Sequence, residues 1–121
     1  MQLQYLTQHD FSAVVRACHM LEAEFVTLSS GEIVSAASST AATYRQASKG
    51  LVSALDSLSD AAMIELQALA SFGRGHKGSD FALTLRDSKD DFNGSTRGYW
   101  VSKPLRSYIE AGLASSRAIL R

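Results

Sequence analysis

The 121-residue sequence lacks most of the features that would assign it to a specialised class of protein. It has a single cysteine, Cys18, so no disulfide can form within the chain, which fits a reducing compartment. No segment has the ~20 consecutive apolar residues that a membrane-spanning helix needs. The first residues, MQLQYLTQHDF, lack the basic and apolar regions of a secretory signal. We therefore expect a cytoplasmic protein that does not enter a membrane.

An excess of charge of one sign is also absent. Twelve basic and twelve acidic residues cancel, whereas a basic excess supplies most of the non-specific affinity of nucleic-acid-binding domains. The composition argues against a strongly basic domain of that kind, but it leaves room for a local basic patch. A net charge near zero gives little repulsion between copies of the chain, which weakly favours a homo-oligomer.

The signatures of catalysis and of metal or cofactor binding are missing as well. The three histidines are scattered, and no Cys-x-x-Cys accompanies them, whereas a structural zinc site needs about four ligands in dense spacing. There is no Gly-x-Ser-x-Gly elbow. In GRGHKG, Gly78 separates Lys77 from Ser79, so the segment is not a phosphate-binding loop. We expect a protein without catalytic residues, bound metal or cofactor.

The apolar residues that are present recur at helical spacing. The pattern predicts helices over 7–25, 39–49, 51–58, 60–72, 80–92 and 104–121, with a short helical turn over 95–102. Residues 3–6, LQYL, are the only strand candidate. The expected fold is all-α, a compact irregular or orthogonal bundle of about five or six short helices. It forms a single domain over 1–121, with the first helix and turn over 1–30 and a helical core over 51–121. The Ala/Ser-rich segment 31–50 between them has little apolar bulk to anchor it, and it is either a lightly packed helix or a mobile connection.

Several residues are expected to begin, end or bring together these helices. Thr7, Ser59 and Ser79 are suited to cap helix N-termini, and Pro104 suits the first turn of the last helix. Gly50 is expected to mark a break, and Gly73 to end its helix in a left-handed conformation. Ala62, Leu66, Leu69, Ala70 and Gly73 form a face of small and aliphatic residues that would let another helix approach closely. Cys18 lies on an apolar stripe, which predicts a buried, unreactive thiol.

Two further charged features are an acidic cluster near the end of a predicted helix and a single arginine, Arg74. Asp87, Asp90 and Asp91 lack the spacing of a calcium loop and are read as a solvated helix end. Arg74, between two glycines, either stays solvated, pairs with a carboxylate such as Glu65, Asp80 or Glu110, or contacts an anion or other small ligand.

The segment RGYWVSKPLRSY interleaves aromatic and cationic residues. Such a set can pack into the core, form a protein interface or bind single-stranded nucleic acid. The core interpretation buries Tyr99 and Trp100 behind Pro104. Together with the Gly-Arg-Gly turn, this segment supplies the candidate interaction residues: Arg74, Lys77, Arg97, Tyr99, Trp100, Lys103, Arg106 and Tyr108.

Three stretches together carry a family resemblance: LDSLSDAAMIELQALASFGRG, DFALTLRDSKDDF and STRGYWVSKPLRSYIEAGL. In this order they resemble a bacterial family catalogued as domain of unknown function thirty-seven seventy-five. The matching positions are Glu65, Leu66, Ala68, Leu69, Gly73, Arg74, Gly75, Asp80, Phe81, Tyr99, Pro104, Leu105, Glu110, Gly112 and Leu113. The resemblance implies a compact helical bacterial domain, and it brings no assigned reaction and no catalytic residues.

These observations favour a small non-catalytic helical protein that works by binding another protein or itself. It could be encoded by a mobile element and act as an inhibitor or adaptor of a larger bacterial machine. Two alternatives stay open. One is a nucleic-acid-binding regulator that uses a local basic and aromatic patch, and the other is a small-ligand or anion binder at the Gly-Arg-Gly turn.

Overall fold

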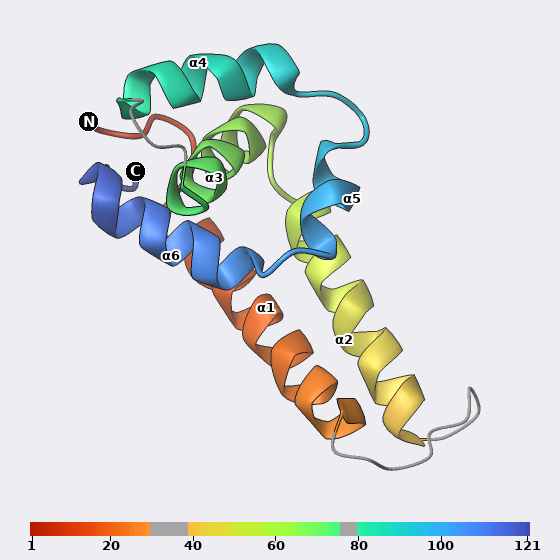
Figure 1. Cartoon of the computed structure of the whole chain (residues 1–121). Helices are drawn as coiled ribbons and strands as arrows, with labels where there is room; N and C mark the ends of the chain where they lie inside the picture. Colours follow the sequence, from red (N-terminus) through yellow and green to blue (C-terminus); the bar gives the residue numbers. More distant parts are fainter. Residues whose placement is uncertain (30–38, 76–79) are drawn as a thin grey trace.

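The computed structural model describes residues 1–29, 39–75 and 80–121 (Figure 1). Within these ranges the chain forms six helices and no strand. They are α1 (Gln8–Ser29), α2 (Ser39–Asp56), α3 (Asp60–Gly73), α4 (Phe81–Asp91), α5 (Thr96–Val101) and α6 (Leu105–Ser116). The predicted all-α bundle of short helices is therefore confirmed.

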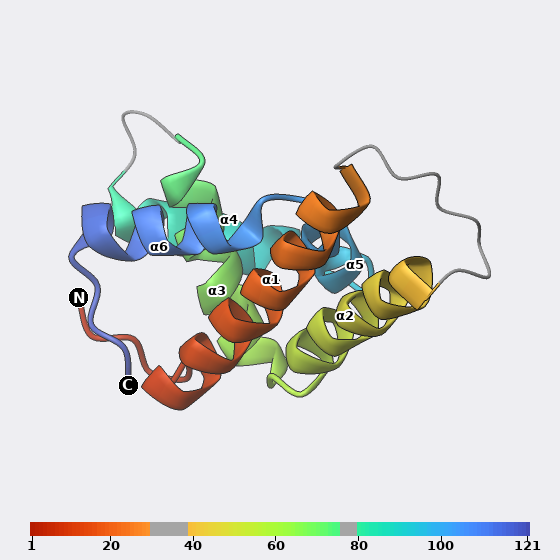
Figure 2. The ribbon, with the colours of Figure 1, turned by 90° about the horizontal axis from the view of Figure 1, so that it is seen from below.

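The helices form two connected groups. α1 and α2 lie side by side as a hairpin, while α3 lies in the centre of the other group, packed against α6 and α4 (Figures 1 and 2). α5 contacts α2 and connects the two groups. The core is continuous across both of them, and its largest fully buried side chains include Val14, Leu55, Met63, Trp100 and Ile109.

α3 and α6 approach each other so closely that only glycine fits at two positions. A Cβ atom added to Gly73 would lie 1.9 Å from the Tyr108 carbonyl oxygen, and one added to Gly112 would lie 1.9 Å from the Leu69 carbonyl oxygen. Both distances are far below van der Waals contact. The predicted close approach along the small-residue face of 62–73 is thus confirmed.

The N-terminal segment is held in place by the buried carboxylate of Glu65 on α3. Its side-chain oxygens accept hydrogen bonds from the backbone N–H groups of Gln4 at 2.9 Å, Tyr5 at 2.8 Å and Leu6 at 2.7 Å. The predicted strand is not formed, and instead Gln2 and Ile119 make one isolated parallel bridge. The two ends of the chain consequently lie beside each other (Figures 1 and 2).

Two of the three predicted N-terminal caps can be seen. Thr7 Oγ1 accepts a hydrogen bond from Asp10 N at 3.0 Å, and Ser59 Oγ accepts one from Ala62 N at 3.1 Å. The third prediction, Ser79, lies outside the described residues. The N-cap of α4 is Asp80, whose Oδ1 accepts from Leu83 N at 2.8 Å. A carboxylate at this position is also stabilised by the positive end of the helix dipole.

Three predictions about helix breaks and ends were wrong. α2 starts at Ser39 as predicted but runs through Gly50 to Asp56, because burial of Ala47 and Leu51 against the core outweighs the ~1 kcal/mol cost of one glycine. α3 does end at Gly73 as predicted, but Gly73 is not left-handed, and a glycine is needed there because α6 approaches closely. The left-handed residue is Gly75, with φ of +107°. The last helix ends at Ser116, five residues short of the predicted end at residue 121.

Candidate functional site

Trp100 on α5 anchors the candidate site through a chain of part-buried hydrogen bonds. Its side chain is 1% exposed, and its Nε1–H donates to Gln67 Oε1 at 3.1 Å. Gln67 Nε2 donates to Ser88 Oγ at 2.9 Å, and Ser88 Oγ donates to the Ile64 carbonyl at 2.7 Å. The chain ties α5 to α3 and α4, so the position and rotation of the indole ring are fixed by three helices. A fully satisfied network of this kind gives a rigid arrangement.

Tyr99 packs against Trp100 and lies at the surface, where it is 44% exposed. Its ring meets the Trp100 ring edge-on, with centroids 4.9 Å apart, and Trp100 meets Tyr108 edge-on at 6.4 Å. The interpretation that places both Tyr99 and Trp100 in the core is therefore right for Trp100 and wrong for Tyr99. Successive residues of a helix point about 100° apart, so one can enter the core while the other faces solvent.

Two cations flank the Tyr99 ring. The guanidinium carbon of Arg74 lies 5.0 Å from the Trp100 ring centroid and 5.7 Å from the Tyr99 centroid, and Arg74 Nη1 donates a hydrogen bond to Tyr99 Oη. Lys103 Nζ lies 4.9 Å from the Tyr99 centroid. All these distances fall within the range of a cation–π interaction. We call Arg74, Tyr99 and Lys103 the Tyr99 ridge.

The charges of the ridge act on the tyrosine itself. The hydrogen bond from Arg74 lowers the pKa of the Tyr99 hydroxyl below its ordinary value of 10.0, and the charges of Arg74 and Lys103 add to this effect. Within the described ranges, neither Arg74 nor Lys103 forms an ion pair with a carboxylate. Among the described residues, the ridge therefore presents two positive charges without ion-pair partners beside a half-exposed aromatic ring.

Arg74 does not pair with any of the three carboxylates suggested from the sequence. Glu65 is occupied by the N-terminal segment, Asp80 caps α4, and Glu110 accepts from Arg106 Nη1 at 3.3 Å. α5 begins 22 positions after Arg74, and the fold brings its aromatic rings next to the arginine.

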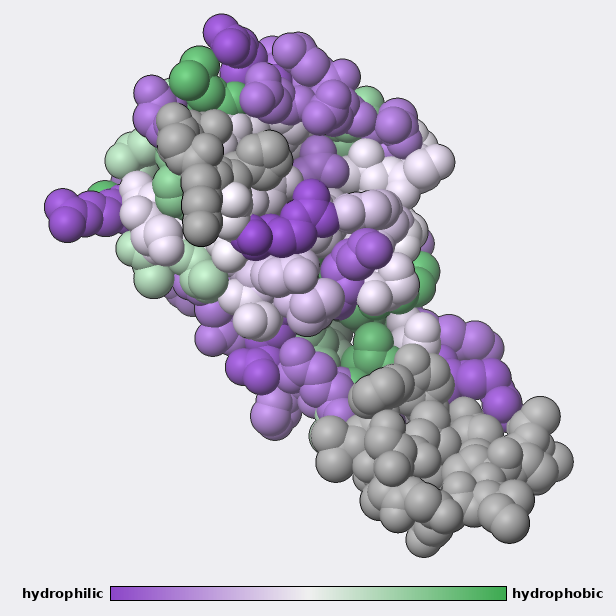
Figure 3. All heavy atoms as spheres, viewed as in Figure 1, coloured by the Kyte–Doolittle hydropathy of each residue, from purple (hydrophilic) through white to green (hydrophobic). Residues whose placement is uncertain are grey.

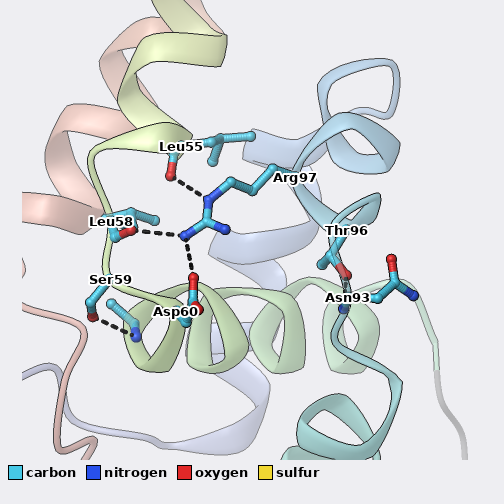
Figure 4. Close-up of polar contacts among 8 residues, drawn as sticks. Leu55, Leu58, Ser59, Asp60, Asn93, Thr96 and Arg97 are labelled. Atoms are coloured by element: carbon cyan, nitrogen blue, oxygen red, sulfur yellow. Dashed lines mark hydrogen bonds and ion pairs between the residues drawn. The ribbon is translucent and has the colours of Figure 1, made fainter.

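Arg97, another candidate interaction residue, has a structural role at the end of α2 (Figure 4). Its Nε donates to the Leu55 carbonyl at 3.1 Å, and its Nη2 donates to the Leu58 carbonyl at 2.9 Å and lies 3.1 Å from Asp60 Oδ1. The guanidinium thus supplies donors to carbonyl groups at the C-terminal end of the helix, where the Leu55 carbonyl also accepts from Leu58 N at 3.2 Å. Its Nε and Nη2 donors are therefore used within the protein.

Arg106 is also engaged within the fold. Its Nε donates to Glu22 Oε2 at 2.8 Å, and its Nη1 donates to Glu110 Oε1 at 3.3 Å. These two carboxylates raise the pKa of Arg106, with the Glu22 hydrogen bond as the main cause. The contact links α6 to α1 and offsets the charge of the guanidinium.

The candidate set is therefore divided. Arg74, Tyr99, Trp100, Lys103 and Tyr108 come together around the ridge, as one cluster. Arg97 and Arg106 lie in contacts of their own. Lys77 lies outside the described residues.

A cavity of about 310 Å³ adjoins the ridge between α3, α4 and α5. Arg74, Tyr99 and Trp100 line one side, and the α4 aspartates Asp87, Asp90 and Asp91 line another. Carboxylates on this wall disfavour a small anion inside the cavity. In the described part of the chain, no group of three or more His, Cys, Asp or Glu side chains is placed to hold a metal ion.

The sequence reasoning missed Gln67 and Ser88, which position Trp100. A signal for them was present in α4, where Phe81, Thr84 and Ser88 follow helical spacing and are all at most 7% exposed. A polar residue continuing an apolar stripe indicates a buried hydrogen bond. Cys18 is buried as predicted, and burial raises the pKa of its thiol from 9.0 to about 12, with the charge of Glu22 as the next cause.

No family model matches the chain, and no curated protein or solved structure shows a significant match to it. The resemblance carried by the Gly-Arg-Gly turn and the C-terminal stretch thus stays an expectation. No helix in residues 1–29, 39–75 and 80–121 is both long and apolar enough to cross a bilayer.

Proposed function

We propose that the protein is a non-catalytic binding module that docks the Tyr99 ridge against an acidic surface of a partner protein. The partner would place carboxylates beside Arg74 and Lys103 and an apolar or planar group on the exposed ring of Tyr99. Tyrosine and arginine are the residue types that most often dominate the energy of protein interfaces.

The observation that carries this proposal is that some cations around the aromatic segment have carboxylate partners and others do not. Arg97 and Arg106 have carboxylate partners within the chain at 3.1 Å and 2.8 Å. Arg74 and Lys103, by contrast, flank an exposed ring and have no carboxylate partner in the described residues. A partner's carboxylates would complete these two charges without first breaking an internal ion pair.

The anchoring of the ridge supports the same conclusion. Tyr99 rests on a buried indole that is hydrogen-bonded to Gln67, and Arg74 is already oriented by its bond to the Tyr99 hydroxyl. Groups that are ordered before binding lose less conformational entropy when the complex forms.

Nucleic acid is the second candidate partner, because phosphates also attract Arg and Lys and bases stack on tyrosine. The structure gives it less support than a protein, since Arg97 and Arg106 are used within the fold and the net charge is zero. Binding to single-stranded DNA or RNA is an outcome that the experiment below would detect.

We further propose that this module acts in the bacterial cytoplasm as an inhibitor or adaptor of a larger assembly. The single cysteine supports a reducing compartment, and the resemblance described above suggests a bacterial source. A self-associating form of the protein, through the same ridge, is the alternative in which the partner is a second copy.

Photo-crosslinking from the ridge tests the proposal. Tyr99 is replaced by p-benzoylphenylalanine in host cells, and the same replacement at Leu83, which is 41% exposed on α4, serves as the control. A protein cross-linked from position 99 and not from 83, and lost in an Arg74→Glu/Lys103→Glu background, supports the proposal. Equal yields from both positions, or cross-links to nucleic acid alone, contradict it. A cross-linked dimer of the chain identifies self-association.

A further inference from the structure

A second surface, separate from the Tyr99 ridge, lies between the N-terminal segment, α3 and α4. It is a groove of about 530 Å³. Its apolar lining comes mainly from Met1, Tyr5, Ile64 and Leu85, and two cations of α4, Arg86 and Lys89, line it as well. We call these six residues the N-terminal groove.

Two of the four apolar side chains of this groove are exposed, and Ile64 and Leu85 are partly buried. Met1 is 52% exposed and Tyr5 is 50% exposed. Large exposed apolar residues that gather in one concavity are typical of binding surfaces, whereas single scattered ones need no explanation. The groove therefore offers apolar area that a partner could bury.

The wall formed by the N-terminal segment is fixed before anything binds. Glu65 holds the N–H groups of Gln4 and Tyr5, and Leu3 N donates to the Ile119 carbonyl at 2.8 Å while Ile119 N donates to the Met1 carbonyl at 2.8 Å. These bonds tie the segment to α3 and to the C-terminal residues. The groove does not have to be assembled by its occupant.

The charges of α4 are divided between the two surfaces. Asp87, Asp90 and Asp91 line the cavity beside Arg74, whereas Arg86 and Lys89 line the N-terminal groove. Figure 3 shows the hydrophilic residues that cover α4 along the upper edge of the molecule. Residues 86 and 89 lie three positions apart, and residues 90 and 91 lie three and four positions after residue 87, so each set occupies adjoining positions on the helix surface.

Neither cation of the groove has a carboxylate partner among the described residues. Glu65 also lines the groove, but it is 4% exposed and both of its oxygens already accept backbone hydrogen bonds. The accessible charge of the groove is therefore positive, beside an apolar floor.

We propose that the N-terminal groove docks an amphipathic acidic segment of a partner protein. Its apolar side chains would cover Tyr5, Ile64 and Leu85, and its carboxylates would meet Arg86 and Lys89. An amphipathic helix laid in an apolar groove is a recurrent mode of peptide recognition, and here the unpaired cations select the sign of its polar face. The site is separate from the Tyr99 ridge, so the protein would have two docking surfaces, as an adaptor requires.

Two synthetic peptides test this proposal directly. One is an amphipathic helix of Leu, Ala and Glu, and the other has Lys in place of every Glu. Each is titrated into the full isotope-labelled chain, and backbone amide shifts are followed by NMR. The acidic peptide is expected to bind saturably at a concentration below about 1 mM, a weak affinity typical of single short segments. Its shifts should centre on Tyr5, Ile64 and Leu85.

Matched double variants separate the charge effect from a change of net charge. Arg86→Glu/Lys89→Glu is expected to weaken binding of the acidic peptide at least roughly tenfold. Arg45→Glu/Lys49→Glu, the same change on exposed residues of α2, should leave it unchanged. Arg74→Glu/Lys103→Glu should also leave binding of the acidic peptide unchanged. The proposal for the groove and the proposal for the Tyr99 ridge can therefore each fail without the other.

The variants are compared by circular dichroism and thermal melting, and Arg86→Gln/Lys89→Gln provides a second, milder pair. No saturable shifts with the acidic peptide, equal binding of the Lys peptide, or shifts that centre away from the groove would each overturn the proposal. A concentration-dependent dimer that covers the groove and excludes the peptide would overturn it in favour of a second copy.

Discussion

Replacement of Glu65 by alanine tests how the N-terminal segment is held. The variant removes the acceptor of three backbone N–H groups, of which that of Leu6 is buried. A hydrogen bond to a charged group contributes about 1.5–3 kcal/mol. The Gln4 and Tyr5 bonds are only partly buried, so water can replace much of what they lose. We therefore expect Glu65→Ala to lower the free energy of unfolding by about 3 kcal/mol, a large part of the 5–15 kcal/mol typical of a domain.

Glu65→Gln should cost about half as much. The amide oxygen can still accept from Tyr5 and Leu6, which share Oε1, but the amide N–H₂ would face the N–H of Gln4. A donor opposed to a donor leaves one bond unmade and adds a repulsion, which corresponds to a loss of about 1–2 kcal/mol.

Urea unfolding followed by circular dichroism measures both losses. Glu110→Ala is the matched control, because Glu110 is an exposed carboxylate on α6 whose surface ion pair should contribute little. Hydrogen exchange at the Leu6 amide reports the local contact, and it should speed up strongly in Glu65→Ala. A loss below about 1 kcal/mol in Glu65→Ala, or a Gln variant as unstable as the Ala variant, would refute this account of Glu65.

Three further predictions concern packing and titration. Gly112→Ala should lower stability by about 3 kcal/mol or more, because its Cβ would meet the Leu69 carbonyl, whereas Gly50→Ala, with open space, should be neutral or stabilising in urea unfolding. Cys18 should resist a thiol reagent in the native state and react on unfolding. Because its pKa is raised from 9.0 to about 12, its contribution to stability is present below pH 9.0 and is lost as the pH rises toward 12. Tyr99 should ionise at lower pH than in an Arg74→Met variant, which absorbance titration with Tyr99→Phe as the blank can show. The lowered pKa of Tyr99 adds stability only at alkaline pH, and this added stability is lost as the pH falls through the pKa of Tyr99 in the folded protein.

The helices could be predicted because their signals are local. Apolar residues at helical spacing and cap residues such as Thr7 and Ser59 act within a few positions of one another, and the structure confirms both. The face of small residues on α3 was likewise readable, since close helix packing requires small side chains on the approaching face. Its partner, Gly112 on α6, could not be assigned from spacing alone.

The contacts that define the site could not be predicted, because they join residues far apart in the chain. Glu65 meets backbone groups about 60 positions away, and Arg74 meets a tyrosine 25 positions away. Charge complementarity suggested carboxylate partners for Arg74, but the fold gives those carboxylates to a helix cap, a backbone segment and another arginine. The same limit applies to Arg97, whose partners are carbonyl groups that no composition reveals.

The charges of the Tyr99 ridge can be separated from its structural role. Arg74 packs on Trp100 at the surface, where a cation–π contact contributes about 0.5–1 kcal/mol. Reversal of its charge should therefore change the melting temperature little. A large loss of stability would instead mean that the arginine holds the fold together.

The most direct test of the central claim is the affinity of the partner cross-linked at position 99 for the purified protein, measured by calorimetry. For Arg74→Glu/Lys103→Glu, with an unchanged melt, we predict binding weaker than wild type by roughly tenfold or more. The matched reversal Arg45→Glu/Lys49→Glu should bind as the wild type does. Equal affinity of the ridge variant and the wild type would contradict the account.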